Sequence, residues 1–302
     1  MKTKTSAAKK PRIGWRDKSF YAICYTITII LTITVLYPIL YIIAASFSSA
    51  SALMSGKVWI FPVEFTTVGY EAILKYKDVW IGYRNTIFYT VTGTFLNVCI
   101  TMCCAYPLAR KTLIGRSKIM FLFTFTMLFG GGMVPSYILV RSLHMKDTIW
   151  AMLIPGAMSV YNMIVARTFI QNNIPDEILE STKIDGCSDT NFFFSMVLPL
   201  SKAIIAVLAL WYAVGHWNAY FNAFLYLSDK ELYPLQIFLR DILINNQLSS
   251  DMDDPEAVAQ RRTIQMLLKY SLIVVSTAPL LTFYPFVQKY FVKGVMIGSV
   301  KG

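Results

Sequence analysis

Charge is scarce in this chain of 302 residues: Asp, Glu, Lys and Arg together make up 15% of it, against about a quarter in a soluble domain. Histidine is scarcer still, because His144 and His216 are the only two and lie too far apart for a metal-binding motif. The sequence also lacks a Gly-x-Ser-x-Gly nucleophile segment and a Gly-x-x-x-x-Gly-Lys-Ser/Thr phosphate loop. We therefore expect no catalytic residue, no metal site and no cofactor bound by this chain.

Cysteine is also infrequent, and no pair has the Cys-x-x-Cys spacing of a redox or zinc site. The five cysteines lie in or beside apolar segments, where they are predicted to be small buried residues and neither disulfides nor metal ligands. They are Cys24, Cys99, Cys103, Cys104 and Cys187.

The apolar residues form long blocks without any charged side chain, such as Ser19–Gly56 and Ala203–Ser228. Each block has the roughly 17–25 residues that a helix needs to cross the hydrocarbon core of a bilayer. The predicted fold class is therefore all-α and integral to the membrane, with no separate soluble domain. The six transmembrane helices expected are Phe20–Phe47, Thr86–Ala109, Ile119–Val140, Thr148–Phe169, Leu198–Leu227 and Met266–Tyr290.

The net charge of +11 is concentrated in short segments beside the apolar blocks. Residues 1–18 hold seven Lys or Arg and one acid, and Arg110–Lys118 holds four basic residues and no acid. Such clusters mark the cytoplasmic side of a membrane protein, which argues against a nucleic-acid partner. We expect both termini in the cytoplasm, a basic tail at 1–18, a membrane domain at 19–302 and an outer loop at 229–265. The first apolar run exceeds the 7–15 residues of a signal-peptide core, so cleavage is not expected.

Proline and glycine interrupt several of the apolar blocks, most strongly at Gly130-Gly131-Gly132 before Pro135. Proline removes a backbone donor and bends a helix, so the bundle is predicted to be kinked. The glycines permit two interpretations, close helix packing through small residues or a moving hinge.

One segment on the expected cytoplasmic side, Arg167–Met196, carries five acids against two basic residues. Pro175 suits the first turn of a helix, Gly186 suits its end and Ser188 can cap a second short helix. The segment is therefore predicted to form two short helices that meet at an angle at Gly186. The alternative is an amphipathic linker lying on the bilayer, but such linkers are usually basic.

This segment resembles the cytoplasmic Glu-Ala-Ala…Gly…Leu-Pro loop of the permease subunits of bacterial ABC importers. Three alanines of that pattern are replaced here by small residues. The loop reads Glu180-Ser181-Thr182, Asp185-Gly186-Cys187 and Leu198-Pro199, and the wider resemblance includes Phe129–Pro135, Tyr212–Asn218 and Val300–Gly302. The chain is most similar to the second permease of maltose-type carbohydrate importers, in the subgroup for complex oligosaccharides such as aldouronates.

The resemblance implies the type I ABC importer permease fold in the bacterial cytoplasmic membrane. The implied partners are a second permease, two cytoplasmic subunits that bind ATP and Mg, an extracellular solute-binding protein, an oligosaccharide substrate and membrane lipid. A coupling loop at 172–198 would insert into a cleft of the ATPase and convert its closure into helix movement. The residues implied in that contact are Glu177, Glu180, Ser181, Thr182, Asp185, Gly186, Cys187 and Pro199.

Helix five is predicted to carry a polar stripe, because Trp211, Gly215, Asn218 and Asn222 follow i, i+4, i+7, i+11 spacing. Amides and aromatic rings suit a sugar, so Asn218, Asn222 and Trp211 are candidates for the substrate pathway, with Tyr161 and Asn162 as weaker ones. The alternative is hydrogen bonding between packed helices. His216 is expected to be a hydrogen-bonded packing residue and not a proton relay.

Two other functions remain possible at this point, an intramembrane transferase and a secondary transporter. The first requires clustered acids or histidines at the membrane face, and many secondary transporters have related halves and intramembrane ionisable groups. The apolar blocks hold almost no acids or histidines, and the sequence shows no related halves.

Overall fold

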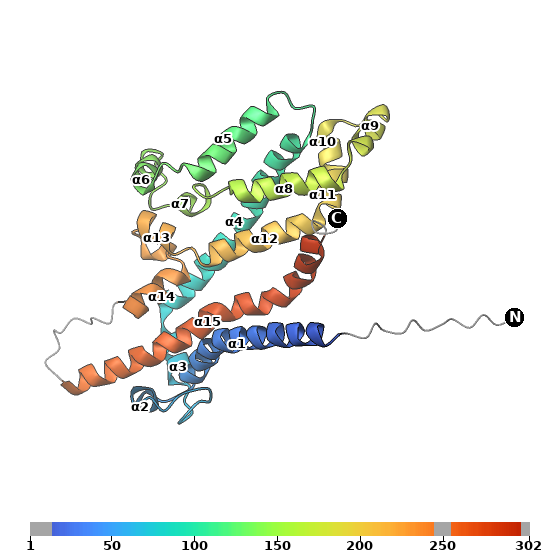
Figure 1. Cartoon of the computed structure of the whole chain (residues 1–302). Coiled ribbons are helices and arrows are strands. Elements are labelled where there is room, and N and C mark those ends of the chain that lie inside the picture. The colour runs from blue at the N-terminus through green and yellow to red at the C-terminus, as the bar shows by residue number, and fades with distance from the viewer. Residues whose placement is uncertain (1–13, 245–254, 297–302) are drawn as a thin grey trace.

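A computed structural model describes residues 14–244 and 255–296, which are helical and contain no strand (Figure 1). In chain order the elements are α1 (Trp15–Ser46), α2 (Ala50–Met54), α3 (Val68–Lys75), α4 (Lys77–Ala109), α5 (Arg116–Leu128), α6 (Met133–Ser142), α7 (Trp150–Leu153), α8 (Val160–Asn173), α9 (Asp176–Ile184), α10 (Asp189–Phe192), the π-helical η1 (Phe193–Val197), α11 (Leu198–Leu200), α12 (Lys202–Trp217), α13 (Phe221–Tyr226), the 3₁₀ turn η2 (Lys230–Leu232), α14 (Leu235–Ile244) and α15 (Pro255–Met296).

Three parts of the predicted organisation lie outside the described residues. They are residues 1–13 of the basic tail, 245–254 within the expected outer loop, and the terminal Val300–Gly302 motif. The rest of the segment 229–265 is mostly helical, because η2, α14 and the start of α15 occupy it.

Helices that can cross a bilayer dominate the fold, as predicted for an all-α membrane protein. Three are long and apolar enough by themselves: α1, α4 and Thr263–Thr282 within α15. Two bent pairs have the same potential, α5 with α6 at 112° and Asp189–Leu200 with α12 at 79°. The described residues thus hold three spans, or five if each bent pair counts as one, and the predicted number of six is not confirmed.

The predicted fourth helix, Thr148–Phe169, is wrong as a continuous element. Helix α7 ends at Leu153 and α8 begins only at Val160, after a break that contains Pro155 and Gly156. Helix α8 has 14 residues, about 21 Å at 1.5 Å per residue, which is shorter than the roughly 30 Å hydrocarbon core. Proline cannot continue the backbone ladder, and this explains the interruption.

The break before α8 is held by a side chain from α12. The hydroxyl of Tyr212 accepts a hydrogen bond from the Ser159 backbone N–H at 3.1 Å and shares another with Thr101 Oγ1 of α4 at 2.7 Å. Ser159 Oγ also accepts from the Asn162 N–H at 3.4 Å and caps α8. Three helices are therefore joined at one buried hydroxyl.

The predicted fifth helix, Leu198–Leu227, is also divided. Helix α11 ends at Leu200, α12 ends at Trp217, and α13 begins at Phe221. The predicted sixth helix lies within the longer α15, whose interior contains Pro279 and Pro285.

Helix α4 is the central element, and α8, α12 and α14 pack along it. The half of α4 that ends at Ala109 contributes to the largest core cluster, in which Met102, Met163 and Leu208 are almost completely buried. Close van der Waals packing of these side chains favours association of α4, α8 and α12, since the surrounding lipid is as apolar as the side chains themselves.

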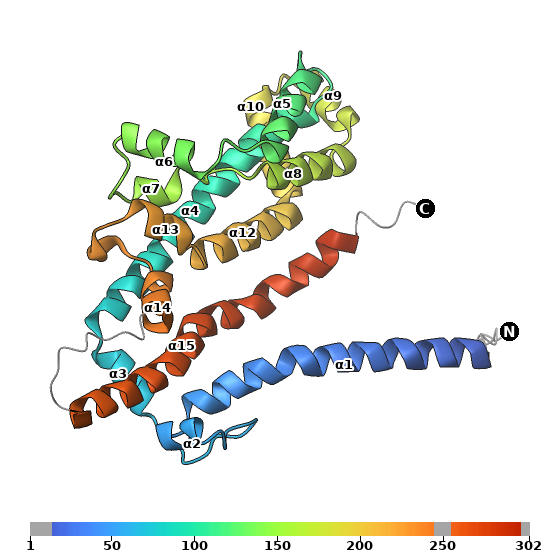
Figure 2. The ribbon, with the colours of Figure 1, turned by 60° about the vertical axis from the view of Figure 1, so that its left-hand side comes forward.

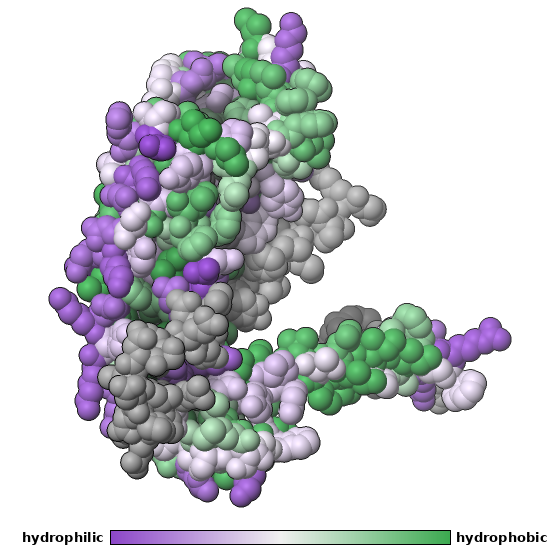
Figure 3. Space-filling model, turned by 90° about the vertical axis from the view of Figure 1, so that its left-hand side faces the viewer, coloured by the Kyte–Doolittle hydropathy of each residue, from purple (hydrophilic) through white to green (hydrophobic). Residues whose placement is uncertain are grey.

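Helix α1 stands apart from this bundle over most of its length (Figure 2). Only Ala44, Ala45 and Ser46, at its end, are buried. The remainder is apolar and appears as a green arm in the hydropathy view (Figure 3). These side chains require lipid or another subunit around them, because water would oppose their exposure.

The cysteines are less buried than the sequence predicted. All five are free; Cys24, Cys99 and Cys103 are exposed on this chain, whereas Cys104 and Cys187 are partly buried. The prediction of burial is wrong for Cys24, Cys99 and Cys103, because α1 and α4 turn these faces away from the rest of the described chain.

The glycine run at 130–132 separates α5 from α6, as the predicted break requires. Gly132 has φ +88°, a backbone conformation that residues other than glycine seldom adopt. A Cβ added at Gly130 or Gly131 would meet no described atom within 4 Å. Close packing against the described part of this chain therefore does not explain these two glycines, and the hinge stays a prediction.

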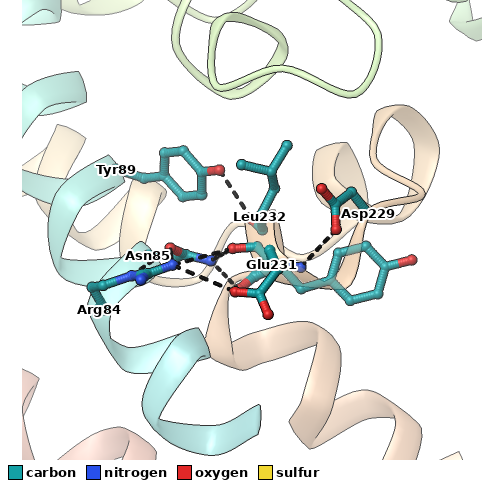
Figure 4. A network of polar contacts seen from close by, with 7 residues as sticks. Arg84, Asn85, Tyr89, Asp229, Glu231 and Leu232 are labelled. Carbon is teal, nitrogen blue, oxygen red and sulfur yellow. Dashed lines mark hydrogen bonds and ion pairs between the residues drawn. The ribbon is translucent and has the colours of Figure 1, made fainter.

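The end of α4 opposite the acidic segment is fastened to η2 (Figure 4). Asn85 Nδ2 donates to the carbonyls of Glu231 at 2.6 Å and Tyr233 at 3.0 Å, and the Tyr89 hydroxyl donates to that of Leu232 at 2.9 Å. Arg84 adds an exposed ion pair with Glu231 at 3.9 Å, which contributes little. These buried amide and hydroxyl groups hold the loop carbonyls against α4.

Candidate functional site

The acidic segment forms an elbow, defined as residues 175–199, that links α8 to α12. Its first arm, α9, begins directly after Pro175, and Asp176 and Glu177 lie in the first turn. Proline satisfies the geometry of a helix start, and the acids interact favourably with the positive end of the helix dipole. The predicted beginning of this helix is confirmed.

Gly186 ends the first arm in a left-handed conformation, with φ +77°. The Cys187 N–H donates to the Thr182 carbonyl at 3.0 Å and the Gly186 N–H donates to the Lys183 carbonyl at 3.0 Å. This pair of bonds is the Schellman motif, which satisfies free carbonyls at a helix end. The predicted bend at Gly186 is confirmed in its geometry.

The second arm begins at Ser188, whose Oγ accepts a hydrogen bond from the Asn191 N–H at 3.2 Å. It consists of α10, η1 and α11 and leads to Pro199, which is exposed. Lys183 and Asp189 form an ion pair of 3.4 Å across the bend, with both side chains largely exposed. The turn is therefore fixed mainly by its backbone bonds, since exposed ion pairs contribute little.

The elbow is anchored by Leu179, which is 6% exposed and packs into the main core cluster. By i, i+4 spacing, the sequence instead predicts that Ile174, Ile178 and Thr182 share one face of the helix. Ile174 is buried, but Ile178 is 36% exposed. Leu179, which the sequence analysis did not single out, belongs to that cluster together with Ala109 of α4 and Phe192 of α10.

The outward surface of the elbow combines acids with one apolar side chain. Glu177, Glu180 and Asp185 are exposed, and within residues 14–244 and 255–296 their carboxylates form no ion pair. Ile184 is 87% exposed beside them, a feature that the sequence analysis did not single out. Such a surface fits a partner with basic groups around an apolar recess.

The small residues Ser181 and Thr182 of the motif form hydrogen bonds within the elbow. Ser181 Oγ donates to the Glu177 carbonyl at 2.8 Å and Thr182 Oγ1 donates to the Leu179 carbonyl at 2.9 Å. Both hydroxyls are thus used within α9. Cys187 is half-buried at the bend.

Asp176 connects the elbow to the end of α4. Lys111 Nζ lies 3.0 Å from Asp176 Oδ2, and Arg110 Nη1 lies 3.5 Å from Oδ1. Hydrogen bonding to Lys111 and the positive charges of Lys111 and Arg110 lower the pKa of the Asp176 carboxyl. Sequence reasoning gave Arg110 only a topological role.

The candidate substrate residues are only partly brought together. Tyr161 of α8 and Trp211 of α12 lie with ring centroids 5.9 Å apart, and Tyr161 is 56% exposed. Asn218 is exposed at the end of α12, where its Nδ2 donates to the Val214 carbonyl at 2.9 Å. Asn162 is 7% exposed.

The predicted stripe does not extend to Asn222. This residue lies in α13, beyond the break at residues 218–220, so the i, i+11 relation to Trp211 is wrong. The turn after Trp217 ends the helical period on which the prediction depended. The part of the stripe that remains on one helix is Trp211 to Asn218.

His216 has the surroundings of a packing residue. Its Nε2 is hydrogen-bonded to the Asn97 amide at 3.1 Å, and its imidazole covers Gly93 so closely that a Cβ there would overlap the ring. Helices α4 and α12 approach each other at this point because Gly93 has no side chain.

Comparisons with known proteins cover nearly all of the chain. A family model described as "Binding-protein-dependent transport system inner membrane component" matches residues 79–297. The chain is 39% identical over 288 residues to the polygalacturonan/rhamnogalacturonan transport system permease protein YtcP of Bacillus subtilis, covering 95% of this chain and 100% of YtcP. It is 43% identical over 272 residues to Protein LplC of the same organism, covering 89% of this chain and 90% of LplC.

A solved structure has the same fold. It belongs to a bacterial ABC transporter involved in the import of the acidic polysaccharide alginate. The superposition has a TM-score of 0.86 with 31% identity and covers 93% of this chain and 100% of that chain.

Proposed function

The chain belongs to the binding-protein-dependent transport system inner membrane component family, and from that membership we propose that it couples oligosaccharide import to partner ATPases through the elbow at 175–199. The family is a transporter permease family, so the chain is a membrane permease subunit; a secondary transporter or an intramembrane transferase is not favoured. The partners proposed are a second permease, two ATP-binding subunits and an extracellular solute-binding protein.

The exposed elbow is the observation that carries the coupling role. Its bend is fixed by the Schellman bonds at Gly186, and its base is anchored in the core by Leu179. Glu180, Asp185 and Ile184 face outward. A rigid lever with a mixed acidic and apolar tip is suited to transmit the movement of a docked motor subunit.

Co-purification and charge reversal test this role. The intact importer, with both permeases and the ATPases, is purified after Glu180→Lys and Asp185→Lys are introduced together. We expect the ATPases to be lost from the complex, or their stimulation by the loaded binding protein to disappear, because the reversed charges repel basic groups of the docking cleft. A matched control is Glu71→Lys on α3, at the opposite end of α4, which should behave as the unmodified chain. Normal stimulation in the elbow variant would refute the docking role.

The proposed orientation follows from the same function. The elbow and both termini would face the cytoplasm, where the ATPases reside, and η2 would face outside. Cysteine labelling in intact cells separates the two sides: Thr190→Cys should resist a membrane-impermeant maleimide, while Lys230→Cys should react. The reverse pattern would overturn the orientation.

The proposed substrate class is an oligosaccharide derived from an acidic polysaccharide. YtcP is named for polygalacturonan and rhamnogalacturonan, and the transporter of the solved relative imports alginate. All three polymers contain carboxylated sugars. Tyr161, Trp211 and Asn218 are the side chains proposed to meet the sugar in the pathway, with Asn162 behind them and Asn222 on the following helix.

Uptake measurements can test this class. Cells that lack the gene, and the same cells carrying it again, are supplied with labelled oligogalacturonides or with neutral arabino-oligosaccharides of equal length. We expect only the acidic substrate to depend on the gene. Gene-dependent uptake of the neutral substrate alone would refute the proposed class and leave the permease assignment intact.

A further inference from the structure

The end of α4 at Ala109 is joined to α8, because side chains of α8 donate hydrogen bonds to the free carbonyls of α4. The last carbonyls of a helix have no partner within the helix. Here Arg167 Nε donates to the Leu108 carbonyl at 2.8 Å, and Gln171 Nε2 donates to the Ala109 carbonyl at 3.1 Å. The end of α4 and the end of α8, from which the elbow departs, are thereby held together.

Arg110, the residue that follows α4, connects this end to both arms of the elbow. Its side chain is only 7% exposed. The guanidinium carbon lies 5.1 Å from the ring centroid of Tyr106 on α4 and 5.1 Å from that of Phe192 on α10. The same group reaches Asp176 of α9 at 3.5 Å. One cation therefore contacts α4, α9 and α10, with two aromatic faces that stabilise its charge.

The buried guanidinium of Arg110 needs these contacts to compensate its positive charge. Its Nε and Nη2 atoms are buried and have no hydrogen-bond partner among the described residues, so the two rings and Asp176 are what compensate its charge. A buried charge that loses its counter-charge is strongly unfavourable. Lys111 also pairs with Asp176, but its side chain is 82% exposed, and such pairs contribute little.

We propose that Arg110 is a positioning residue that fixes the elbow to α4, so that displacement of the elbow by the ATPase is passed directly to this helix. The inference rests on the coupling role proposed above. Helix α4 extends from Lys77 to Ala109, and its other end carries the Asn85 contacts to η2 (Figure 4). The elbow, α4 and η2 then move as one body. The elbow is joined to α4 directly by Arg110, and not only through α8 and α12, which flank it in sequence.

Transport measurements on the reconstituted importer test the joint. Arg110→Met removes the charge and keeps a long apolar side chain, while Lys111→Gln is the matched neighbouring control. We expect Arg110→Met to retain its ATPase partners and hydrolyse ATP, but to transport severalfold less substrate per ATP; Lys111→Gln should keep the normal ratio. Arg110→Lys should recover only part of the ratio, because the ammonium restores charge without the planar fork of arginine. A normal ratio in Arg110→Met would overturn the proposal.

A distance measurement provides a second test that a general loss of stability would not imitate. Spin labels are placed at native Cys103 on α4 and at Thr190→Cys on α10, with the other cysteines replaced. We expect one narrow distance distribution, equal with and without ATP, and a broad or nucleotide-dependent distribution after Arg110→Met. A distance that already changes with ATP in the unmodified protein, or that stays narrow in the variant, would refute the joint.

The two proposals fail differently. If the elbow variant Glu180→Lys/Asp185→Lys loses stimulation and Arg110→Met transports normally, coupling through the elbow stands and the joint to α4 is wrong. If the elbow variant is normal, the coupling role itself is wrong, and with it the purpose of the joint.

Discussion

Substitutions at Gly186 distinguish the effect of backbone conformation in the elbow from the effect of side-chain size at this position. This glycine has φ +77°, and a Cβ added there would meet no described atom within 4 Å. A larger side chain is therefore opposed by backbone conformation and not by a clash within the chain. An ordinary L-residue in the left-handed region costs about 1–2 kcal/mol, and a β-branched one is more strongly disfavoured.

We expect Gly186→Val to weaken the elbow by at least about 1–2 kcal/mol, a factor of about 5–30 in the population of the bent form. Asparagine tolerates the left-handed region, so Gly186→Asn is the matched variant. In the purified importer, ATPase activity stimulated by the loaded binding protein should fall several-fold with valine and stay near normal with asparagine.

The results for Gly186→Val and Gly186→Asn test whether a fixed bend couples the elbow to the ATPase. Equal losses in both variants would mean that the ATPase contacts Gly186 closely and that side-chain size, not backbone conformation, is responsible. Normal stimulation and transport with valine would refute the argument that a fixed bend couples the subunits. The melting temperature of each complex serves as the control, because the elbow is small and its strain should not unfold the bundle.

Three further predictions concern the packing of α4. Gly93→Ala should lower stability by about 1–3 kcal/mol, because its Cβ would overlap the His216 ring. In the control Gly215→Ala, the added Cβ meets no described atom within 4 Å, so the melting temperature should stay nearly unchanged. A larger loss of melting temperature in Gly215→Ala than in Gly93→Ala would contradict this packing. Tyr212→Phe should cost about 1–3 kcal/mol through the buried groups left unpaired before α8, and an unchanged melting temperature would count against that bond. The pKa of Asp176 lies below the ordinary value of about 3.9, so its ion pairs should stabilise the fold at neutral pH and be lost as the pH falls through the lowered value. The difference in melting temperature between the unmodified chain and Asp176→Asn should therefore be constant from about pH 5 to 8 and shrink only in stronger acid; a difference that changes near pH 7 would contradict the assignment.

Local chemistry made the elbow predictable from the sequence. Pro175 at a helix start, Gly186 at a helix end and Ser188 at the next cap each act through bonds to neighbours a few residues away. Such signals need no knowledge of distant segments. The same holds for the long apolar helices, because the absence of charge over a membrane-spanning length is a property of composition.

Interruptions inside apolar segments were harder to predict. The break between α7 and α8 contains Pro155, but its form depends on the Tyr212 hydroxyl, which arrives from a distant part of the chain. The end of α12 at Trp217 has no proline beside it, and Gly215 lies inside the helix without ending it; this end removed Asn222 from the predicted stripe. Helical periodicity cannot reveal a turn that tertiary contacts impose.

By itself, the sequence determined that this protein is helical and membrane-embedded, with an acidic elbow bent at Gly186, because composition and local backbone chemistry suffice for those features. Only the tertiary structure decided what the elbow is attached to. Arg110 belongs to a basic segment that marks topology in the sequence, yet it lies buried between Tyr106 and Phe192 and against Asp176. These contacts join residues up to about eighty positions apart, and a buried charge finds its partners only when the helices that carry them have packed.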